Sequence, residues 1–234
     1  EGFDIADSSG NILNEFQLSN AIDGCVGVIH LAAVSRVVWG EKDPDNCWKT
    51  NAIASEKLLK IALNSRLMPW VLVASSREVY GEASVFPVVE SADIKQVTIY
   101  GRAKANMEQQ AFKIRDAGLN TAVVRLANVY GCTKDHPDRV LPAFCFNASN
   151  NFDLRVDGKD HVFDFTHISD TVYGISLIAE QLTNKERNLP PIHLLPGIGT
   201  SLIEAAEIAI KAAKSRSKII EAPSRNYDVT RFIG

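Results

Sequence analysis

The sequence predicts an α/β fold in which helices cover a parallel sheet. Short β-rich apolar runs alternate with longer segments of helical periodicity, and this alternation is typical of parallel sheets. Residues 70–74 are apolar throughout, as in a strand that is buried on both faces. After Gly131 the strands become sparse and the loops longer, which indicates a second, smaller lobe.

Each expected element has its own signal. The expected strands are dense apolar runs, at residues 25–31, 70–75, 121–126 and 192–195. The expected helices have apolar residues three or four positions apart, at residues 44–64, 100–117, 168–183 and 201–214. Gly118 is placed to end the second helix, and Ser201, with Glu204 three residues later, is placed to cap the fourth. The polar residues 147–153 are expected to form a surface loop.

Length and composition are those of an ordinary soluble globular protein, with 234 residues of which 46% are hydrophobic and 23% charged. A net charge of -3 gives no reason to expect nucleic acid or an anionic membrane as a partner. No apolar run approaches the ~20 residues that cross a bilayer, and the acidic start lacks a signal segment, so we expect a cytoplasmic protein. The four cysteines lack metal-ligand spacing, so we expect free thiols and no metal site.

Tyr100 and Lys104 point to a chemical reaction. Positions four apart lie on one face of a helix, so the Lys104 ammonium is expected beside the Tyr100 phenol. A cation there favours the phenolate and would bring the pKa of a tyrosine, ordinarily about 10, toward that of a general base. Ser76 ends a buried strand, and ligands gather at the carboxyl ends of parallel strands. Ser76, Tyr100 and Lys104 therefore predict a hydroxyl-oxidising site that works with a nicotinamide cofactor.

The surrounding motifs follow a recognisable order along the chain. They are VIHLAA at 28–33, Asn51 opening NAIASEKLL at 51–59, VASSREVYG at 73–81, YGRAK at 100–104, RLANVYG at 125–131, DFTHISD at 164–170 and PSRNYDV at 223–229. Together they resemble the extended short-chain dehydrogenase/reductase family, whose best-known members are nucleotide-sugar epimerases and dehydratases. The resemblance implies a Rossmann-type doubly wound parallel sheet in residues 1–130. It also implies a mainly substrate-binding lobe in residues 131–234, of which 164–197 return to the sheet.

The resemblance also implies ligands. The expected cofactor is NAD, with NADP left open because the acid that discriminates between them is absent. The residues that this resemblance assigns to the cofactor are Asp4, Ile5, Leu31, Ala32, Ala33, Asn51, Ala74, Ser75, Tyr100 and Lys104. Those that it assigns to a nucleotide-sugar substrate are Arg36, Ser76, Glu78, Asn128 and Arg225. Arg36 is equally compatible with a surface position, and Asn51 with a bond to its own helix or to a neighbouring loop.

The implied reaction is epimerisation of the sugar at C4 through a transient 4-keto intermediate, as in UDP-glucose 4-epimerases. Dehydratase relatives carry Asp-Glu or Ser-Glu after the catalytic Ser or Thr, whereas this chain has Arg77 before Glu78, and an arginine cannot act as an acid. Glu78 is open to three interpretations: a base, a contact to the sugar, or an anchor of its loop. A dehydratase, decarboxylase or 4-keto reductase remains an alternative, as does a non-catalytic nucleotide-binding regulator. The resemblance further implies a homodimer through the helices at 44–64 and 100–117.

One part of the Rossmann pattern is missing from the sequence. The glycine-rich turn and the first two strands are not found, and the opening Gly2-Phe-Asp4-Ile5 resembles the segment after the third strand. We therefore expect a fragment that lacks the N-terminal glycine-rich segment and the extreme C-terminus. The strand at 25–31 is then expected at an edge of the sheet.

Overall fold

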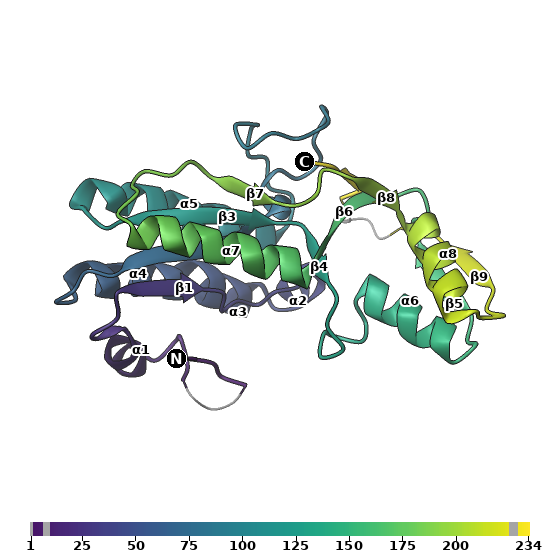
Figure 1. Cartoon of the computed structure of the whole chain (residues 1–234), viewed down its shortest axis with the longest axis horizontal. Coiled ribbons are helices and arrows are strands. Elements are labelled where there is room, and N and C mark those ends of the chain that lie inside the picture. Colours follow the sequence, from purple (N-terminus) through teal and green to yellow (C-terminus); the bar gives the residue numbers. More distant parts are fainter. Residues whose placement is uncertain (1, 7–9, 225–228) are drawn as a thin grey trace. The chain divides into compact units, whose positions relative to one another are not determined.

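The computed structural model describes residues 2–6, 10–224 and 229–234 (Figure 1). These residues form two compact units, each made of several stretches of the chain. The first unit comprises residues 1–81, 93–126 and 173–193, and the second comprises 82–92, 127–172 and 194–234. In the part of the chain that is described, no helix is both long enough and apolar enough to cross a membrane.

A four-stranded sheet forms the centre of the first unit. Its strand order is β1 (Gly27–His30), β2 (Trp70–Ser76), β3 (Thr121–Leu126) and β7 (Ile192–Leu194). β2 runs parallel to both β1 and β3, and the register pairs Val73 with His30 on one side and with Val123 on the other. The carboxyl ends of these strands therefore meet at one edge of the sheet, where ligands gather in such folds.

Helices cover both faces of this sheet. α4 (Ala54–Asn64) and α5 (Ile99–Lys113) lie behind the strands in Figure 1, and α7 (Ile168–Thr183) crosses in front of them. A hydrophobic core lies between the sheet, α4, α5 and the short helix α1 (Glu15–Ile22). Its buried members are Ile12, Leu18, Ile22, Ala54, Leu58, Leu59, Ala62, Val71, Val73, Met107, Ala111, Leu119 and Val123. Leu72 and Val124, which point to the opposite face of the strands, are also fully buried, so the sheet is apolar on both sides.

The helix that precedes β2 is interrupted by a π-helical segment. Pro44 starts α3 (Pro44–Trp48), and the chain continues through the π-helical residues Lys49–Ile53 into α4. α5 begins at the cap Thr98, whose hydroxyl accepts a hydrogen bond from the Gly101 N–H, and it passes into a 3₁₀ turn, Ile114–Ala117. Gly118 ends that turn with a φ of 101°, in the left-handed region that glycine adopts without strain.

The second unit has small sheets of its own. β6 (Val162–His167) pairs with β4 (Asn128–Tyr130), β8 (Gly199–Ser201) and β10 (Arg231–Phe232), and β5 (Leu154–Asp157) pairs with β9 (Ile219–Ala222). Two helices pack beside them, α6 (Val140–Ser149) and α8 (Leu202–Ala213). The buried carboxylate of Asp164 accepts hydrogen bonds from the N–H groups of Ile198 and Gly234, so it joins β6 to two later segments.

The predicted α/β class with a parallel sheet is confirmed. β3 and α7 have the predicted bounds, and the predicted capping box is present at Ser201 and Glu204. The expectation of a loop at 147–153 is wrong at its start, because residues 147–149 form the last turn of α6. α6, α1 and α2 (Val37–Lys42) were not predicted, and neither were the strands β4, β5, β6, β8, β9 and β10.

Gly101 allows the first turn of α5 to approach the segment that follows β2. A Cβ atom at this position would lie 2.6 Å from the carbonyl oxygen of Glu78. Glycine to alanine in an open helix stabilises by about 1 kcal/mol, whereas overpacking against backbone costs about 1–3 kcal/mol. We therefore expect Gly101→Ala to lower the free energy of unfolding, by on the order of 1 kcal/mol, in denaturant titrations.

Gly40→Ala in α2 is the matched control, since its new methyl group would meet only side-chain atoms, with Cys47 Sγ nearest at 3.1 Å. A Gly101→Ala protein at least as stable as the wild type would show that α5 is not held this closely.

Candidate active site

Ser76 is the last residue of β2, at the carboxyl edge of the sheet. Its hydroxyl oxygen accepts a hydrogen bond of 3.3 Å from the N–H of Glu78, and this bond caps the 3₁₀ turn Arg77–Val79. A hydroxyl that accepts one bond still has its own hydrogen to donate. Ser76 is therefore held by the turn and can bind an oxygen atom at this edge.

Tyr100 and Lys104 lie one turn apart on the inner face of α5. Both are buried, with 8% and 3% of their surface exposed. The Lys104 ammonium lies 5.9 Å from the centroid of the Tyr100 ring and donates a 2.7 Å hydrogen bond to the carbonyl oxygen of Ala74 in β2. The structure thus brings Tyr100, Lys104 and the end of β2 together.

Burial lowers the pKa of Lys104 to about 8, while the neighbouring Cys47 and Glu108 act in the opposite direction. At neutral pH this amine is still mostly protonated. A buried cation close to the Tyr100 ring favours the phenolate of that tyrosine, and this is the charge arrangement of a hydroxyl-deprotonating site.

Asn51 lies within the π-helical segment and is fully buried. Its Oδ1 accepts from the N–H of Val34 at 2.7 Å, and its Nδ2 donates to the carbonyl oxygen of Val34 at 2.9 Å. The Asn51 amide therefore holds the loop after β1, which contains the predicted cofactor residues Leu31, Ala32 and Ala33. The bond to a neighbouring loop is thus present in the structure, and Nδ2 also lies 3.6 Å from Cys47 Sγ one turn earlier in the same helical segment.

His30 supports the same segment from the end of β1. Its Nε2 lies 2.8 Å from the hydroxyl of Ser55, and that hydroxyl donates to the Asn51 carbonyl oxygen at 2.8 Å. Because the Ser55 hydrogen is used in this way, His30 Nε2 must be the donor of its own bond. Burial, and secondarily the charge of Lys104, lower the pKa of His30 to about 3, so the imidazole is neutral.

The other predicted cofactor residues differ in their surroundings. Asp4 and Ile5 lie in an exposed turn, in which the Asp4 carboxylate accepts from the N–H of Ala6. Ser75 is 3% exposed, and its hydroxyl has no hydrogen-bond partner among the described residues. A buried hydroxyl in this state is one that a bound ligand or water can satisfy, and it lies beside the Ala74 carbonyl that Lys104 contacts. These groups fit the polar part of a nicotinamide cofactor.

The predicted substrate residues are divided between the two units. Glu78 is buried, and its carboxylate forms an ion pair of 2.9 Å with Arg77. The Arg36 guanidinium lies 5.4 Å from the centroid of the Trp39 ring. Asn128 starts β4 in the second unit, where it pairs with Phe165, and Arg225 lies outside the described residues.

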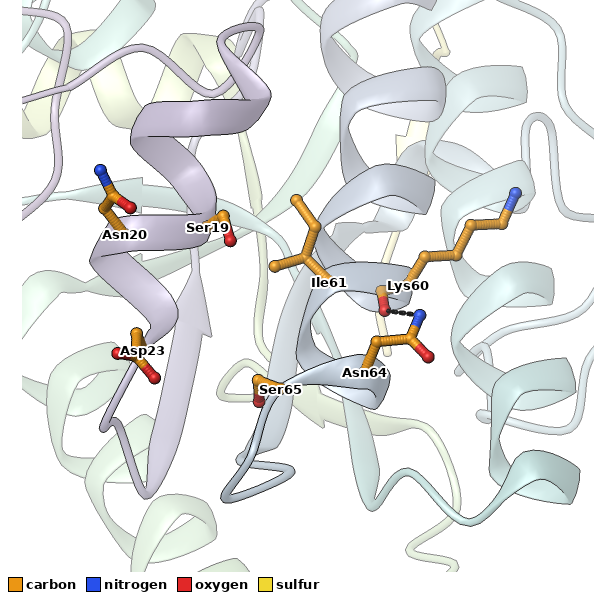
Figure 2. A pocket seen from close by; sticks show the side chains of 7 residues that line it. All are labelled: Ser19, Asn20, Asp23, Lys60, Ile61, Asn64 and Ser65. Atoms are coloured by element: carbon orange, nitrogen blue, oxygen red, sulfur yellow. Dashed lines mark hydrogen bonds between the residues drawn. The ribbon is translucent and has the colours of Figure 1, made fainter.

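Two hollows occur elsewhere on the surface of the described residues. Figure 2 shows the first, of about 390 Å³, between α1 and the C-terminal end of α4; its lining residues are Ser19, Asn20, Asp23, Lys60, Ile61, Asn64 and Ser65. α4 ends just before β2 begins, so this hollow lies at the opposite edge of the sheet from Ser76. The second, of about 340 Å³, is in the other unit and includes Tyr130, His167 and Asp170. Neither hollow contains any of the predicted site residues, and no cluster of metal-ligating side chains is present in the described ranges.

The residues that support the site were missed by sequence reasoning. Ser55 and Val34 act through hydrogen bonds that fix Asn51, and no sequence pattern signals them. Glu108 had a detectable signal, because it continues the spacing of four residues that relates Tyr100 to Lys104.

The parallel sheet with helices on both faces defines a Rossmann-type α/β fold, with a serine at the carboxyl end of a central strand and a Tyr/Lys pair on the next α-helix. The chain belongs to the NAD dependent epimerase/dehydratase family, whose model matches residues 6–189.

The similar proteins include both epimerases and dehydratases. A UDP-glucose 4-epimerase of Cyamopsis tetragonoloba is 25% identical over 223 residues, which are 87% of this chain and 63% of that protein. A dTDP-glucose 4,6-dehydratase of Streptomyces antibioticus is 28% identical over 156 residues, or 66% of this chain and 46% of that protein. The chain thus spans about half to two thirds of the length of these relatives.

The fold is also that of a solved enzyme structure. The UDP-glucuronic acid 4-epimerase of Bacillus cereus, in complex with UDP-glucuronic acid and NAD, superposes with a TM-score of 0.86 at 21% identity. The superposition covers 97% of this chain and 71% of that one.

His30 offers a test of the site's electrostatics by pH. Since its pKa is about 3 in the folded protein and 6.5 when unperturbed, the unfolded chain binds more protons between these values. Stability is therefore lost as the pH falls below 6.5. His30→Gln, which keeps a donor for Ser55, lacks this titration. Between pH 7 and pH 4.5 the wild type should lose on the order of 2 kcal/mol more than the variant in urea titrations.

The same substitution at the exposed His136 is the control and should leave the wild-type pH dependence in place. Parallel stability curves for wild type and His30→Gln would mean that His30 accepts a proton in the folded protein.

Proposed function

We propose that the protein catalyses NAD-dependent epimerisation of a nucleotide sugar at C4. The observation that carries the proposal is the buried Tyr100–Lys104 pair at the carboxyl end of β2, beside Ser76. The family, and the epimerases among its similar proteins, support the nucleotide sugar as substrate and NAD as cofactor.

Ser76, Tyr100 and Lys104 divide the chemistry among them. Ser76 donates a hydrogen bond to the C4 oxygen and orients it. Tyr100, as the phenolate, removes the C4 hydroxyl proton, and the charge of Lys104 stabilises that phenolate. When bound, NAD would supply reversible hydride transfer at C4, so that the sugar is inverted with no net oxidation. Tyr100 would return the proton to the C4 oxygen.

The remaining residues would hold the two ligands. Leu31, Ala32, Ala33, Ala74 and Ser75 would contact NAD at the edge of the sheet, with Asp4 and Ile5 near its adenine and Asn51 acting through the loop that it binds. Lys104 would exchange its bond to the Ala74 carbonyl oxygen for one to the nicotinamide ribose. Arg225 and Asn128 would bind the diphosphate, and Arg36 would line the sugar pocket.

The Arg77–Glu78 pair favours epimerisation over the alternative, dehydration. Elimination of water from the sugar needs an additional acid and base next to the catalytic serine. Here Arg77 cannot be the acid, and the Glu78 carboxylate is engaged at 2.9 Å by that same arginine. A carboxylate that an ion pair holds in place is a good anchor for a sugar hydroxyl, and this is the role that we assign to Glu78.

Product analysis tests the reaction. Purified protein with NAD should convert UDP-glucose to the C4-inverted sugar without accumulating a keto product. A 4-keto-6-deoxy sugar formed from UDP-glucose or dTDP-glucose would establish dehydration instead. Tyr100→Phe, which removes the proton acceptor, should lower kcat by about 10²-fold or more.

Tyr173→Phe is the matched control, because this tyrosine lies on α7, is 66% exposed and has no assigned role in the proposed chemistry. Turnover of the substrate by Tyr100→Phe at the wild-type rate would contradict the role assigned to Tyr100. Nucleotide binding without turnover in either protein would favour the non-catalytic alternative.

The assembly and location are part of the same proposal. The family resemblance supports a homodimer formed through α3, α4 and α5, and the four free cysteines suit a reducing cytoplasm. Light scattering on the purified protein should give twice the mass of its monomer. A single monomeric species at assay concentrations would contradict the dimer.

A further inference from the structure

Four polar side chains from four different segments form a continuous hydrogen-bonded chain inside the first unit. Glu108 lies on α5, Arg125 on β3, Tyr80 follows the turn after Ser76, and His193 lies on β7. Arg125 holds Glu108 through two bonds, Nε to Oε1 at 2.9 Å and Nη2 to Oε2 at 2.6 Å. Its Nη1 donates to the Tyr80 hydroxyl, which lies 2.7 Å from His193 Nε2. We call these four residues the clamp.

Arg125 is the donor in each of its bonds in the clamp, because a guanidinium can only donate. Both oxygens of the Glu108 carboxylate and the Tyr80 oxygen therefore accept from it. The bond between the Tyr80 hydroxyl and His193 Nε2 extends the clamp to β7. The clamp thus runs from Arg125 to Glu108 on one side and through Tyr80 to His193 on the other.

The ion pair in the clamp is buried, and a buried ion pair adds little net stability to a fold. Glu108, Arg125 and Tyr80 are 1%, 3% and 1% exposed. Removing two charges from water costs about as much as their attraction returns, so packed apolar side chains would stabilise the fold as well. What apolar side chains cannot supply is direction, since a bidentate guanidinium fixes both the distance and the angle between its partners.

The segments that the clamp joins are those that carry the catalytic groups. Glu108 is one turn beyond Lys104 and two turns beyond Tyr100 on the same face of α5. Tyr80 lies four residues after Ser76, and Arg125 is the β3 neighbour of Ser75 in the parallel register. The clamp therefore connects the strand end that bears Ser76 with the helix that bears Tyr100.

Two backbone contacts act on the same turn. The N–H of Lys95 donates to the Val79 carbonyl oxygen at 3.0 Å, and Gly101 lets α5 approach the carbonyl of Glu78. These contacts fix the backbone of the turn at residues 77–79. The buried side chain of Tyr80 fixes the end of the same turn, and its hydroxyl is the only group of that side chain that can form a hydrogen bond.

We propose that the clamp formed by Glu108, Arg125, Tyr80 and His193 is a positioning device that sets the Ser76 hydroxyl against the Tyr100 phenol. The proposal rests on the proposed function for its catalytic consequence. None of the four residues is assigned contact with substrate or cofactor, and each acts through Ser76, Lys104 or Tyr100. Because small misplacements of reacting groups are costly to rate, loosening the clamp should affect turnover more than binding.

Tyr80→Phe is the sharpest variant, since it removes one oxygen atom and keeps the ring in the core. It should lower kcat by about tenfold, the value of one buried hydrogen bond, and leave KM within about twofold. His193→Leu should have a similar effect, whereas His193→Gln, whose amide can still form a hydrogen bond with Tyr80, should retain a higher kcat than His193→Leu. Tyr173→Phe on the surface of α7 is the control and should behave as wild type.

Amide hydrogen exchange gives a readout that needs no turnover. In Tyr80→Phe, residues 77–81 and 99–104 should exchange about tenfold faster than in wild type, while residues 71–74 in the centre of β2 should not change. Unchanged exchange at residues 77–81 and 99–104 would overturn the proposal, whatever the activity. A wild-type kcat in Tyr80→Phe would also overturn it, as would a decrease in kcat that is explained entirely by a smaller fraction of folded protein. An inactive wild type with the expected exchange would instead refute the proposed function and leave the clamp established.

Discussion

The structure of the first unit depends on one requirement, which is that every buried polar group on the inner face of α5 must find a partner in the sheet. Tyr100, Lys104 and Glu108 recur every fourth residue along a face that is otherwise apolar. Lys104 binds a β2 carbonyl oxygen and Glu108 binds the β3 arginine, so two strands fix the helix along and around its axis. An unpaired charge at either position would cost several kcal/mol, which makes other placements of this helix unfavourable.

The loop after β1 obeys the same requirement in a different way. The helix that faces it contains a π-helical segment, and the change in hydrogen-bond spacing there brings the Asn51 amide toward the Val34 backbone. The Ser55 hydroxyl then satisfies the Asn51 carbonyl oxygen, and the neutral His30 donates to Ser55. In both places a residue with a proposed role is held by hydrogen bonds to its neighbours, and at Asn51 these bonds stabilise the irregular helical segment.

Sequence reasoning recovered the elements whose signals are local. β3 and α7 had clear apolar periodicity and well-marked ends, and Ser201 with Glu204 formed the expected cap. α6 was missed because Pro142 and Asn147 interrupt its pattern, although its packing against α8 keeps it helical. The π-helical segment and the clamp could not be predicted, because their partners lie 17 to 113 residues apart in the sequence. Spacing alone indicated Tyr100 and Lys104, but only the folded chain reveals that Arg77 binds its own neighbour, Glu78.

The division of the chain into interleaved stretches has a consequence for its synthesis. The backbone passes from one unit to the other five times, and α7 itself begins in the second unit and ends in the first. On a ribosome, residues 127–172 must emerge before the last stretch of the first unit, with β7 and the later part of α7, can join its sheet. Until then α7 does not cover its face of β2 and β3, and β7 is missing from the sheet. Nascent chains of this length are therefore expected to depend on chaperones that shield apolar strands until residue 193 has left the exit tunnel.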